Sequence, residues 1–238
     1  MTKVKQATVI TGATRGIGLA IAKRLAACGH QVVGIARQDT GDFFPGKLFQ
    51  ADLTDSKETL NALNNINAKY NITGVINNVG VANPQSIEDV DPVIFRQTID
   101  LNLGLSVTVT QAFLAGMKRC GYGRILNISS RAALGRPLRT SYSAAKSGLI
   151  GMTRSWALEL AEFGITANVL APGLTETGMM RKNNPNIIEQ EAQIPMKRTG
   201  QPDEIAAVAQ FLISPEASYV TGQVLYVCGG LSVGTSYV

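Results

Sequence analysis

Short apolar segments rich in β-branched residues alternate with longer amphipathic or small-residue segments along the chain. This alternation is typical of repeated strand–helix–strand units, which form a parallel sheet with helices on its faces. The expected strands are Thr8–Thr11, Gln31–Ile35, Leu48–Ala51, Gly74–Asn77, Arg124–Ile128, Thr166–Leu170 and Val224–Val227. Helical periodicity is clearest in Gly16–Cys28, Lys57–Lys69, Leu101–Met117, Ser143–Phe163 and Asp203–Leu212. The pattern predicts one Rossmann-type, doubly wound α/β domain over residues 1–238.

The stretch from Gly173 to Gln201 breaks this regularity, since it is rich in Gly, Asn and Pro and has a polar middle. Irregular segments of this length in compact domains are usually functional or disordered. We therefore interpret residues 174–201 as a lid over a binding site. A plain surface connection is the alternative interpretation.

Length and composition exclude several classes of protein. The 238 residues suit one α/β domain with a large core, and no apolar run approaches the roughly 18 residues of a membrane span. The N-terminus has no signal-peptide pattern, and three widely separated cysteines predict reduced thiols, so we expect a cytoplasmic protein. The net charge of +5 arises from scattered basic residues, so we expect neither a nucleic-acid nor a membrane partner.

The chain has a single histidine, His30, which lies in a turn-like sequence between two periodic segments. One histidine in such a place excludes Ser–His–Asp hydrolysis and histidine-rich zinc sites. Acid–base chemistry must therefore come from Tyr, Lys, Asp or Glu, and we predict no metal site.

A glycine-rich turn follows the first expected strand and leads into the first expected helix. Glycine allows a tight turn and close approach to a diphosphate, while the helix N-terminus offers free N–H groups and a positive dipole end. The spacing is G-x-x-x-G-x-G instead of the commoner G-x-G-x-x-G. The position of this turn predicts a dinucleotide phosphate site made by Gly12, Thr14, Arg15, Gly16, Ile17 and Gly18.

The end of the second expected strand indicates which dinucleotide binds. A carboxylate at this place selects the ribose 2′-hydroxyl of NAD, whereas a cation accommodates the 2′-phosphate of NADP. Here the strand ends with Ala36, followed by Arg37, and Arg15 in the glycine turn can approach the same phosphate. We therefore predict NADP(H) as the cofactor. The alternative is that both arginines are solvated surface charges and that Asp39 binds the ribose.

Tyr142 and Lys146 are four residues apart, on one face of an expected helix. A tyrosine with a pKa near 10 is a poor acid–base catalyst at neutral pH, and a nearby cation lowers that pKa by favouring the phenolate. Upstream, an expected strand ends in Ser129 and Ser130, and strand carboxyl ends are where doubly wound sheets bind ligands. An exposed helix pair and a helix-capping serine are the alternatives if these residues are taken singly.

The stretches Gly164-Ile165-Thr166-Ala167-Asn168-Val169-x-Ala171-Pro172-Gly173 and Gly200-Gln201-Pro202-Asp203-Glu204-Ile205-Ala206 resemble those of the 3-oxoacyl-acyl carrier protein reductases. Taken together with the motifs above, they show that the chain resembles the short-chain dehydrogenase/reductase family over nearly its whole length. The matching elements are Thr11-Gly12-x-x-x-Gly16-Ile17-Gly18, Asp52-Leu53, Asn77-Asn78-Val79-Gly80, Asn102, Ser130, Tyr142-x-x-x-Lys146, Pro172-Gly173 with Thr177, and Gly229-Gly230. The spacing from Ser130 to Tyr142 is one residue shorter than the family pattern, so Ser129 competes with Ser130 for the catalytic role.

The resemblance implies a catalytic role for four residues. Tyr142 exchanges the proton with the substrate, and Ser130 polarises the substrate carbonyl. Lys146 lowers the tyrosine pKa and binds the nicotinamide ribose, while Asn102 positions a water that relays protons to Lys146.

The resemblance also implies cofactor contacts and assembly. Asp52 and Leu53 contact the adenine, Asn78 and Gly80 lie along the adenosine ribose, and the nicotinamide end is held by the segment containing Pro172, Gly173, Thr175 and Thr177. The family fold is a seven-stranded parallel sheet, commonly assembled as a homotetramer through the tyrosine-bearing helix and the last strand.

The resemblance implies an NADPH-dependent reduction of ketones, with 3-oxoacyl thioesters as the leading substrate class. The alternative is a secondary-alcohol dehydrogenase or a reductase of other small ketones. An acyl carrier protein is a possible partner, although the positions of Gly121 and Phe163, where such enzymes tend to be basic, are not basic here. Substitute cations for that contact are Lys118, Arg119, Arg136 and Arg139.

Overall fold

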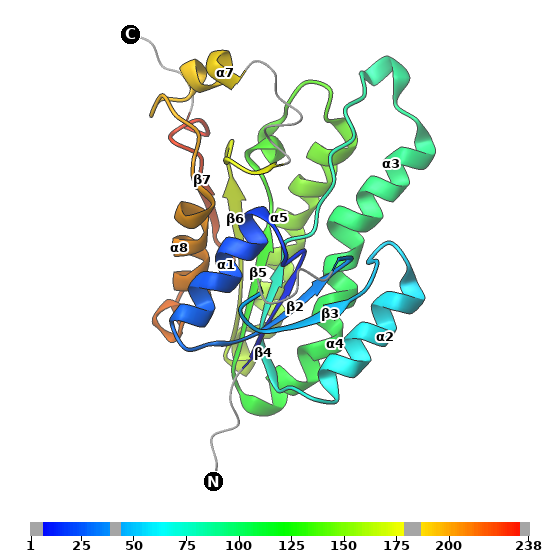
Figure 1. The fold of residues 1–238 in the computed structure, drawn as a ribbon, viewed down its shortest axis with the longest axis vertical. Helices are drawn as coiled ribbons and strands as arrows, with labels where there is room; N and C mark the ends of the chain where they lie inside the picture. The colour runs from blue at the N-terminus through cyan, green and yellow to red at the C-terminus, as the bar shows by residue number, and fades with distance from the viewer. Residues whose placement is uncertain (1–6, 39–43, 179–186, 234–238) are drawn as a thin grey trace.

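The computed structural model describes residues 7–38, 44–178 and 187–233. A seven-stranded parallel sheet forms its centre, in the order β3-β2-β1-β4-β5-β6-β7 (Figure 1). The strands are β1 (Ala7–Thr11), β2 (Gln31–Ala36), β3 (Lys47–Gln50), β4 (Ile72–Asn77), β5 (Gly123–Ile128), β6 (Ile165–Pro172) and β7 (Val224–Val227). The predicted fold class is confirmed, and each expected strand is present with its ends shifted by at most two residues.

Helices cover both faces of the sheet. They are α1 (Gly16–Ala27), α2 (Ser56–Asn67), α3 (Pro92–Ile99), α4 (Leu105–Cys120), α5 (Thr140–Leu160), α7 (Ile187–Gln193) and α8 (Pro202–Ile213). On one face α1 and α8 lie side by side (Figure 1), with Leu25 and Leu212 in the same buried cluster. On the other face α2, α4 and α5 bury Leu63, Phe113 and Leu160. Because helices cover both faces, the central strands are nearly continuous apolar runs.

The strand order changes direction beside β1, which pairs with β2 on one side and β4 on the other. Doubly wound sheets bind ligands at the carboxyl ends of their strands, next to such a switch point. The glycine turn after β1 and Ser130 after β5 both lie at this edge. The sheet therefore brings the two sequence-predicted parts of the site to one side of the molecule.

Helix α3 was not among the expected elements, although its start carries a recognisable signal. The Asp91 carboxylate accepts hydrogen bonds from the N–H groups of Val93 (2.6 Å) and Ile94 (3.0 Å), and Pro92 occupies the first turn. A π-helical turn, η3 (Asp100–Gly104), then joins α3 to α4. Such turns within helices frequently mark functional sites, and this one carries Asn102.

The segment interpreted as a lid has an ordered base. Thr175 and Gly200 form a parallel bridge. The Glu176 N–H donates to the Gly200 carbonyl (2.8 Å), and the Gly200 N–H donates to the Leu174 carbonyl (2.9 Å). The segment also contains α7, which the irregular sequence did not predict, while residues 179–186 lie outside the described part of the chain.

Three further expectations concern the cysteines, His30 and membrane-spanning helices. Cys28, Cys120 and Cys228 are free thiols, as their spacing predicted. His30 lies partly buried in the turn after α1, and its burial lowers its pKa. Among the residues that the structure describes, none of the helices is long and apolar enough to cross a membrane.

Candidate active site

The turn between β1 and α1 has the geometry of a phosphate cradle. Gly12 and Gly16 have φ angles of +65° and +53°, in the left-handed region that favours glycine. A β-carbon on Gly18 would collide with the Gly12 carbonyl oxygen and the Asn78 amide. Arg15 is the N-cap of α1, and its side chain makes no capping hydrogen bond to the first-turn N–H groups. The cradle therefore fits a diphosphate at a helix N-terminus.

Asn78 and Thr11 brace this cradle, a role that the sequence reasoning missed. The Asn78 side-chain amide donates to the carbonyl oxygens of Thr11 (3.0 Å) and Gly12 (3.2 Å). In return, the Thr11 hydroxyl oxygen accepts from the N–H groups of Asn78 (3.0 Å) and Val79 (3.2 Å). The amide nitrogen of Asn78 is thus committed to the cradle, so a ribose contact by this residue would involve its other atoms.

The predicted adenosine end lies at the carboxyl end of β2. Ala36 is buried at the strand end, while Arg37 and Arg15 are exposed at the same edge of the sheet. Asp52 is pre-oriented, because its carboxylate accepts from the N–H and the hydroxyl of Thr54 (2.9 and 2.8 Å). These two bonds, with the charge of Arg37, lower the pKa of Asp52. Leu53, the other predicted adenine contact, is partly buried against the core. Thr14 and Ile17 are partly buried in the glycine turn. Asp39, the alternative ribose ligand, lies outside the described residues.

The two candidate serines have different environments. Ser129 is buried, and its hydroxyl donates to the Lys146 carbonyl oxygen (2.7 Å), which fixes helix α5 against β5. The Ser130 hydroxyl lies near enough to Tyr142 to lower the pKa of its phenol. Its hydroxyl oxygen also accepts from the Ala132 N–H (3.1 Å). This geometry favours Ser130 over Ser129 as the partner of the tyrosine.

Lys146 is 2% exposed and lies beneath the tyrosine. Its Nζ donates to the Ile128 carbonyl oxygen (2.9 Å) and lies 5.6 Å from the centroid of the Tyr142 ring. Burial lowers the pKa of Lys146 to about 8. The lysine is therefore close to losing its charge near neutral pH.

The expected lowering of the Tyr142 pKa by Lys146 does not hold in this structure. Burial raises the pKa of Tyr142, and this effect outweighs the lowering by the Ser130 hydroxyl and by the charges of Arg139 and Arg136. The discrepancy arises because desolvation penalises the phenolate more than the neighbouring groups stabilise it. A neutral phenol is the form that donates a proton, so the environment favours Tyr142 as an acid.

The Asn102 side chain and the Lys146 ammonium group both lie close to Gly80. The Asn102 side chain is fully enclosed; its amide donates to the carbonyls of Val81 (2.9 Å) and Thr98 (2.8 Å), and its oxygen accepts from the Val81 N–H (3.2 Å). A β-carbon on Gly80 would lie 2.7 Å from Asn102 Oδ1 and 3.2 Å from Lys146 Nζ. The hydrogen bonds of Asn102, on the π-helical turn, thus hold the segment after β4 close to Lys146. The role of Asn102 in positioning a proton-relay water stays a prediction.

The predicted nicotinamide end begins where β6 ends at Pro172. Gly173 lies so close to the residue that follows β7 that a β-carbon would lie 2.7 Å from the Cys228 Cα. The buried Thr175 hydroxyl donates to the Gly173 carbonyl (3.2 Å). Thr177 reaches the cradle, since its Cγ2 would lie 3.2 Å from a β-carbon on Gly16.

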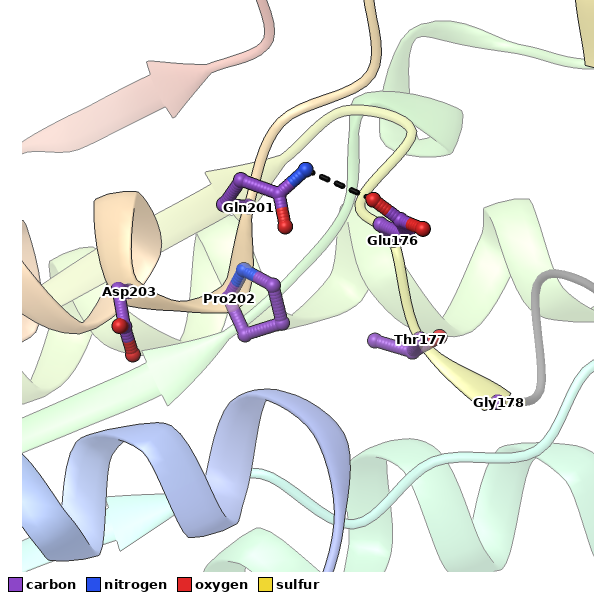
Figure 2. Close-up of a pocket in the computed structure, with 6 residues that line it drawn as sticks. All are labelled: Glu176, Thr177, Gly178, Gln201, Pro202 and Asp203. Carbon is purple, nitrogen blue, oxygen red and sulfur yellow. Dashed lines mark hydrogen bonds between the residues drawn. The ribbon is translucent and has the colours of Figure 1, made fainter.

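A cavity of about 580 Å³ lies beside this segment, with helix α1 next to it (Figure 2). Its lining residues are Glu176, Thr177, Gly178, Gln201, Pro202 and Asp203. The Gln201 amide closes one side by donating to the Glu176 carboxylate (2.8 Å). The cavity is next to the cradle and does not include the serine–tyrosine–lysine cluster, so it fits the cofactor side of the site. Among the described residues, no group of three or more His, Cys, Asp and Glu could hold a metal.

A doubly wound sheet with a glycine cradle and an adjacent Ser130–Tyr142–Lys146 cluster defines a Rossmann-type oxidoreductase. Residues 12–232 match the family model described as enoyl-(acyl carrier protein) reductase. The chain belongs to the short-chain dehydrogenase/reductase family, and it is an oxidoreductase of that family.

Two curated relatives illustrate the similarity. The chain is 37% identical over 236 residues to the 3-oxoacyl-(acyl-carrier-protein) reductase MabA of Mycobacterium bovis, covering 97% of this chain and 94% of the relative. It is 35% identical over 233 residues to the 3-oxoacyl-(acyl-carrier-protein) reductase FabG of Vibrio cholerae, covering 94% of this chain and 96% of the relative.

Two solved structures share the fold over almost the whole length. A variant of the actinorhodin polyketide ketoreductase with NADPH gives a TM-score of 0.90 at 30% identity, covering 98% of both chains. The aldohexose dehydrogenase of Thermoplasma acidophilum also gives 0.90 at 30% identity, covering 98% of this chain and 96% of that one.

Proposed function

We propose that the chain is an NADPH-dependent ketone reductase whose leading substrate class is the 3-oxoacyl thioesters. The observation that carries the proposal is the cluster of Ser130, Tyr142 and the buried Lys146, whose Nζ lies 5.6 Å from the centroid of the Tyr142 ring, at the same sheet edge as the glycine cradle. Two similarities support it: the curated relatives are named 3-oxoacyl-(acyl-carrier-protein) reductases, and the similar polyketide ketoreductase was solved with NADPH.

The residues of the site divide the reaction between them. When bound, NADPH supplies the hydride for the substrate carbonyl carbon. Ser130 donates a hydrogen bond to the carbonyl oxygen, and Tyr142 donates its phenolic proton to the same oxygen, so the ketone becomes a secondary alcohol. Lys146 holds the nicotinamide ribose and a positive charge behind the tyrosine. Asn102, next to Lys146, positions the water through which Tyr142 regains its proton from solvent.

Steady-state assays with purified protein test this function. NADPH consumption is measured with acetoacetyl coenzyme A and with a panel of simple ketones. We expect a higher turnover rate with acetoacetyl coenzyme A than with the simple ketones. Failure to reduce any ketone with NADPH or NADH would contradict it.

The alternative is oxidation of a secondary alcohol, and the aldohexose dehydrogenase among the similar structures supports including it. The same residues serve both directions, because Tyr142 as a phenolate accepts the proton that it donates in reduction. Assays with NADP⁺ and secondary alcohols, run beside the ketone panel, separate the two directions.

An acyl carrier protein is the proposed donor of the thioester. Although Phe163 is not basic, the Lys118 Nζ lies 4.1 Å from the centroid of its ring. A cation therefore occupies the surface at this position. Lys118 and Arg119 are the proposed contacts for an acidic acyl carrier protein.

Cofactor selectivity gives a first prediction. NADPH should be preferred over NADH by at least about tenfold, since a charge-assisted contact of Arg37 with the 2′-phosphate contributes on the order of 1.5 to 3 kcal/mol. Ala36→Asp should move the preference toward NADH, because its carboxylate repels the phosphate and accepts from a 2′-hydroxyl. The measurement is kcat/KM for each cofactor, and equal values in the unmodified chain would refute the selectivity.

A second prediction concerns assembly. We expect a homotetramer, because α5 carries a face of small residues and Leu158 on that helix is 85% exposed. Apolar side chains are also exposed around β7, among them Phe211, Tyr219 and Leu225. Multi-angle light scattering should give about four times the 25.3 kDa chain mass, and a stable monomer at micromolar concentration would contradict this.

A further inference from the structure

Three arginines lie near Ser130 and Tyr142 and have no part in the mechanism proposed above. Arg131 directly follows Ser130 and begins the short helix η4 (Arg131–Leu134). Arg139 precedes Tyr142 by three residues and is the N-cap of α5. Arg136 lies on the connection between them. All three arginines thus lie on the segment that joins Ser130 to Tyr142.

The backbone that carries these arginines is held in place. The Ser147 hydroxyl donates to the Ala133 carbonyl (2.7 Å), which fixes η4 to α5. Gln85 forms a parallel bridge with Arg139, and its N–H donates to the Leu138 carbonyl (3.1 Å). Leu138 has a φ angle of +60°, a conformation that a branched side chain rarely adopts. A fixed and locally strained loop is typical of a binding site more than of a plain connection.

The positive charges lack compensation. In the described part of the chain, none of the three arginines forms an ion pair. Burial lowers the pKa of Arg136, and the charges of Arg139 and Arg131 lower it further. Besides burial, the groups that affect the pKa of Arg136 are these two arginines and Tyr142, and no carboxylate is among them. Like charges gathered without a counter-ion destabilise one another, so an anion from outside the chain would relieve this repulsion.

We propose that Arg131, Arg136 and Arg139 bind a carboxylate on the substrate, close to the carbonyl that is reduced. The inference rests on the proposed ketone reduction and narrows its substrate class to oxo compounds with an anionic end. Guanidinium groups match a carboxylate because their donors form paired hydrogen bonds with its two oxygens. Leu134 and Leu138, 55% and 54% exposed, lie on the same loop and suit an apolar stretch between carbonyl and carboxylate.

A phosphate of the pantetheine arm does not fit these arginines as well. In an acyl thioester that phosphate is separated from the reacting carbonyl by the whole pantetheine chain. Arg136 and Arg139, by contrast, are near enough to Tyr142 for their charges to act on its phenol. The anion that they bind must therefore belong to the acyl or oxo-acid part of the substrate.

Matched substrate pairs test the proposal. One pair is 3-oxoadipyl coenzyme A and 3-oxohexanoyl coenzyme A, which share a six-carbon chain and differ in the terminal carboxylate. The other is levulinate and its methyl ester. In the unmodified protein, kcat/KM should favour the carboxylate member of at least one pair by about tenfold or more, mainly through KM. The first pair reports a thioester with an acidic end, the second a free oxo acid.

Variants then assign the preference to the arginines. The double variant Arg136→Gln/Arg139→Gln should lose the preference, and restoring one charge with Arg136→Lys should recover part of it. Because the charges also act on Tyr142, the ratio within a pair is the readout, since a change in the acid affects both members equally. The control is Arg24→Gln, an exposed arginine at the far end of α1, which should keep the ratio. Unchanged NADP⁺ affinity verifies folding.

A binding measurement separates this proposal from the proposed function. Isothermal titration of glutarate into the protein with NADP⁺ should show binding that the double variant loses, whether or not any ketone is turned over. Arginine-dependent glutarate binding without ketone reduction would leave the anion site standing and reject the reductase. Ketone reduction with no preference within either pair, and no arginine-dependent binding of glutarate, would overturn the anion site alone.

Discussion

Replacing Tyr142 with phenylalanine should remove nearly all turnover and leave NADPH affinity almost unchanged. The phenolic proton is needed only in the transition state, whereas the cofactor is held mainly by phosphate and ribose contacts elsewhere. General acid catalysis contributes roughly a hundred- to ten-thousand-fold, so the loss in kcat should reach or exceed that range. The measurements are kcat with a 3-oxoacyl thioester and a fluorescence titration with NADPH.

Tyr70→Phe is the matched control, because Tyr70 lies just before β4, at the edge of the sheet opposite the candidate site. It should keep the kinetics of the unmodified protein. Near-normal turnover of the Tyr142→Phe variant would mean that another group donates the proton. Ser130 or a bound water would then be the remaining candidates.

The effect of Lys146→Ala should differ from that of Tyr142→Phe, because Lys146→Ala should lower both kcat and the affinity for NADPH. The variant removes the ribose contacts and the charge behind Tyr142, so we expect at least about a hundredfold loss in kcat and about tenfold weaker NADPH binding. A variant that loses turnover alone would contradict the ribose contact. The same two measurements used for Tyr142 distinguish these outcomes.

The lysine also predicts a pH dependence. Since burial lowers its pKa to about 8, Lys146 is charged below that pH and becomes neutral above it. The value of kcat/KM for NADPH, which reports on the free enzyme, should therefore fall as the pH rises through about 8. A Lys146→Arg variant, which stays charged, should show no such fall even if its activity is low. A flat profile in the unmodified protein would contradict a role for the charge.

The inner strands β1, β2, β4, β5 and β6 could be read from the sequence because they are buried on both faces, which makes them short apolar runs with clear ends. The missed elements lack that contrast. Helix α3 is only eight residues long and has one buried side chain, Thr98, so periodicity does not mark it. The sequence signal for this helix is local, because it consists of the N-cap Asp91 and of Pro92 in the first turn. Helix α7 is seven residues long and has no buried residue, so its sequence resembles a polar loop.

The candidate site was predictable in position but not in electrostatics. The carboxyl ends of β1 and β5 bring the glycine turn and Ser130 together, which follows from topology alone. Whether Ser129 or Ser130 faces Tyr142 depends on which hydroxyl the Lys146 carbonyl engages, and spacing does not reveal it. The direction of the Tyr142 pKa depends on a balance between burial and neighbouring charges in three dimensions. The bracing of the cradle by Asn78 likewise depends on strands that are distant in sequence.

The most direct test of carbonyl reduction at this site follows the hydride itself. The purified protein is incubated with acetoacetyl coenzyme A and NADPH that carries deuterium at C4 of the nicotinamide, on one face or the other. NMR spectroscopy of the product should show deuterium on the carbon that bore the ketone with one labelled face only. The Tyr142→Phe variant should form at most a small fraction of this product in the same time. Absence of deuterium from that carbon with both labels, or equal product from the variant, would contradict the account.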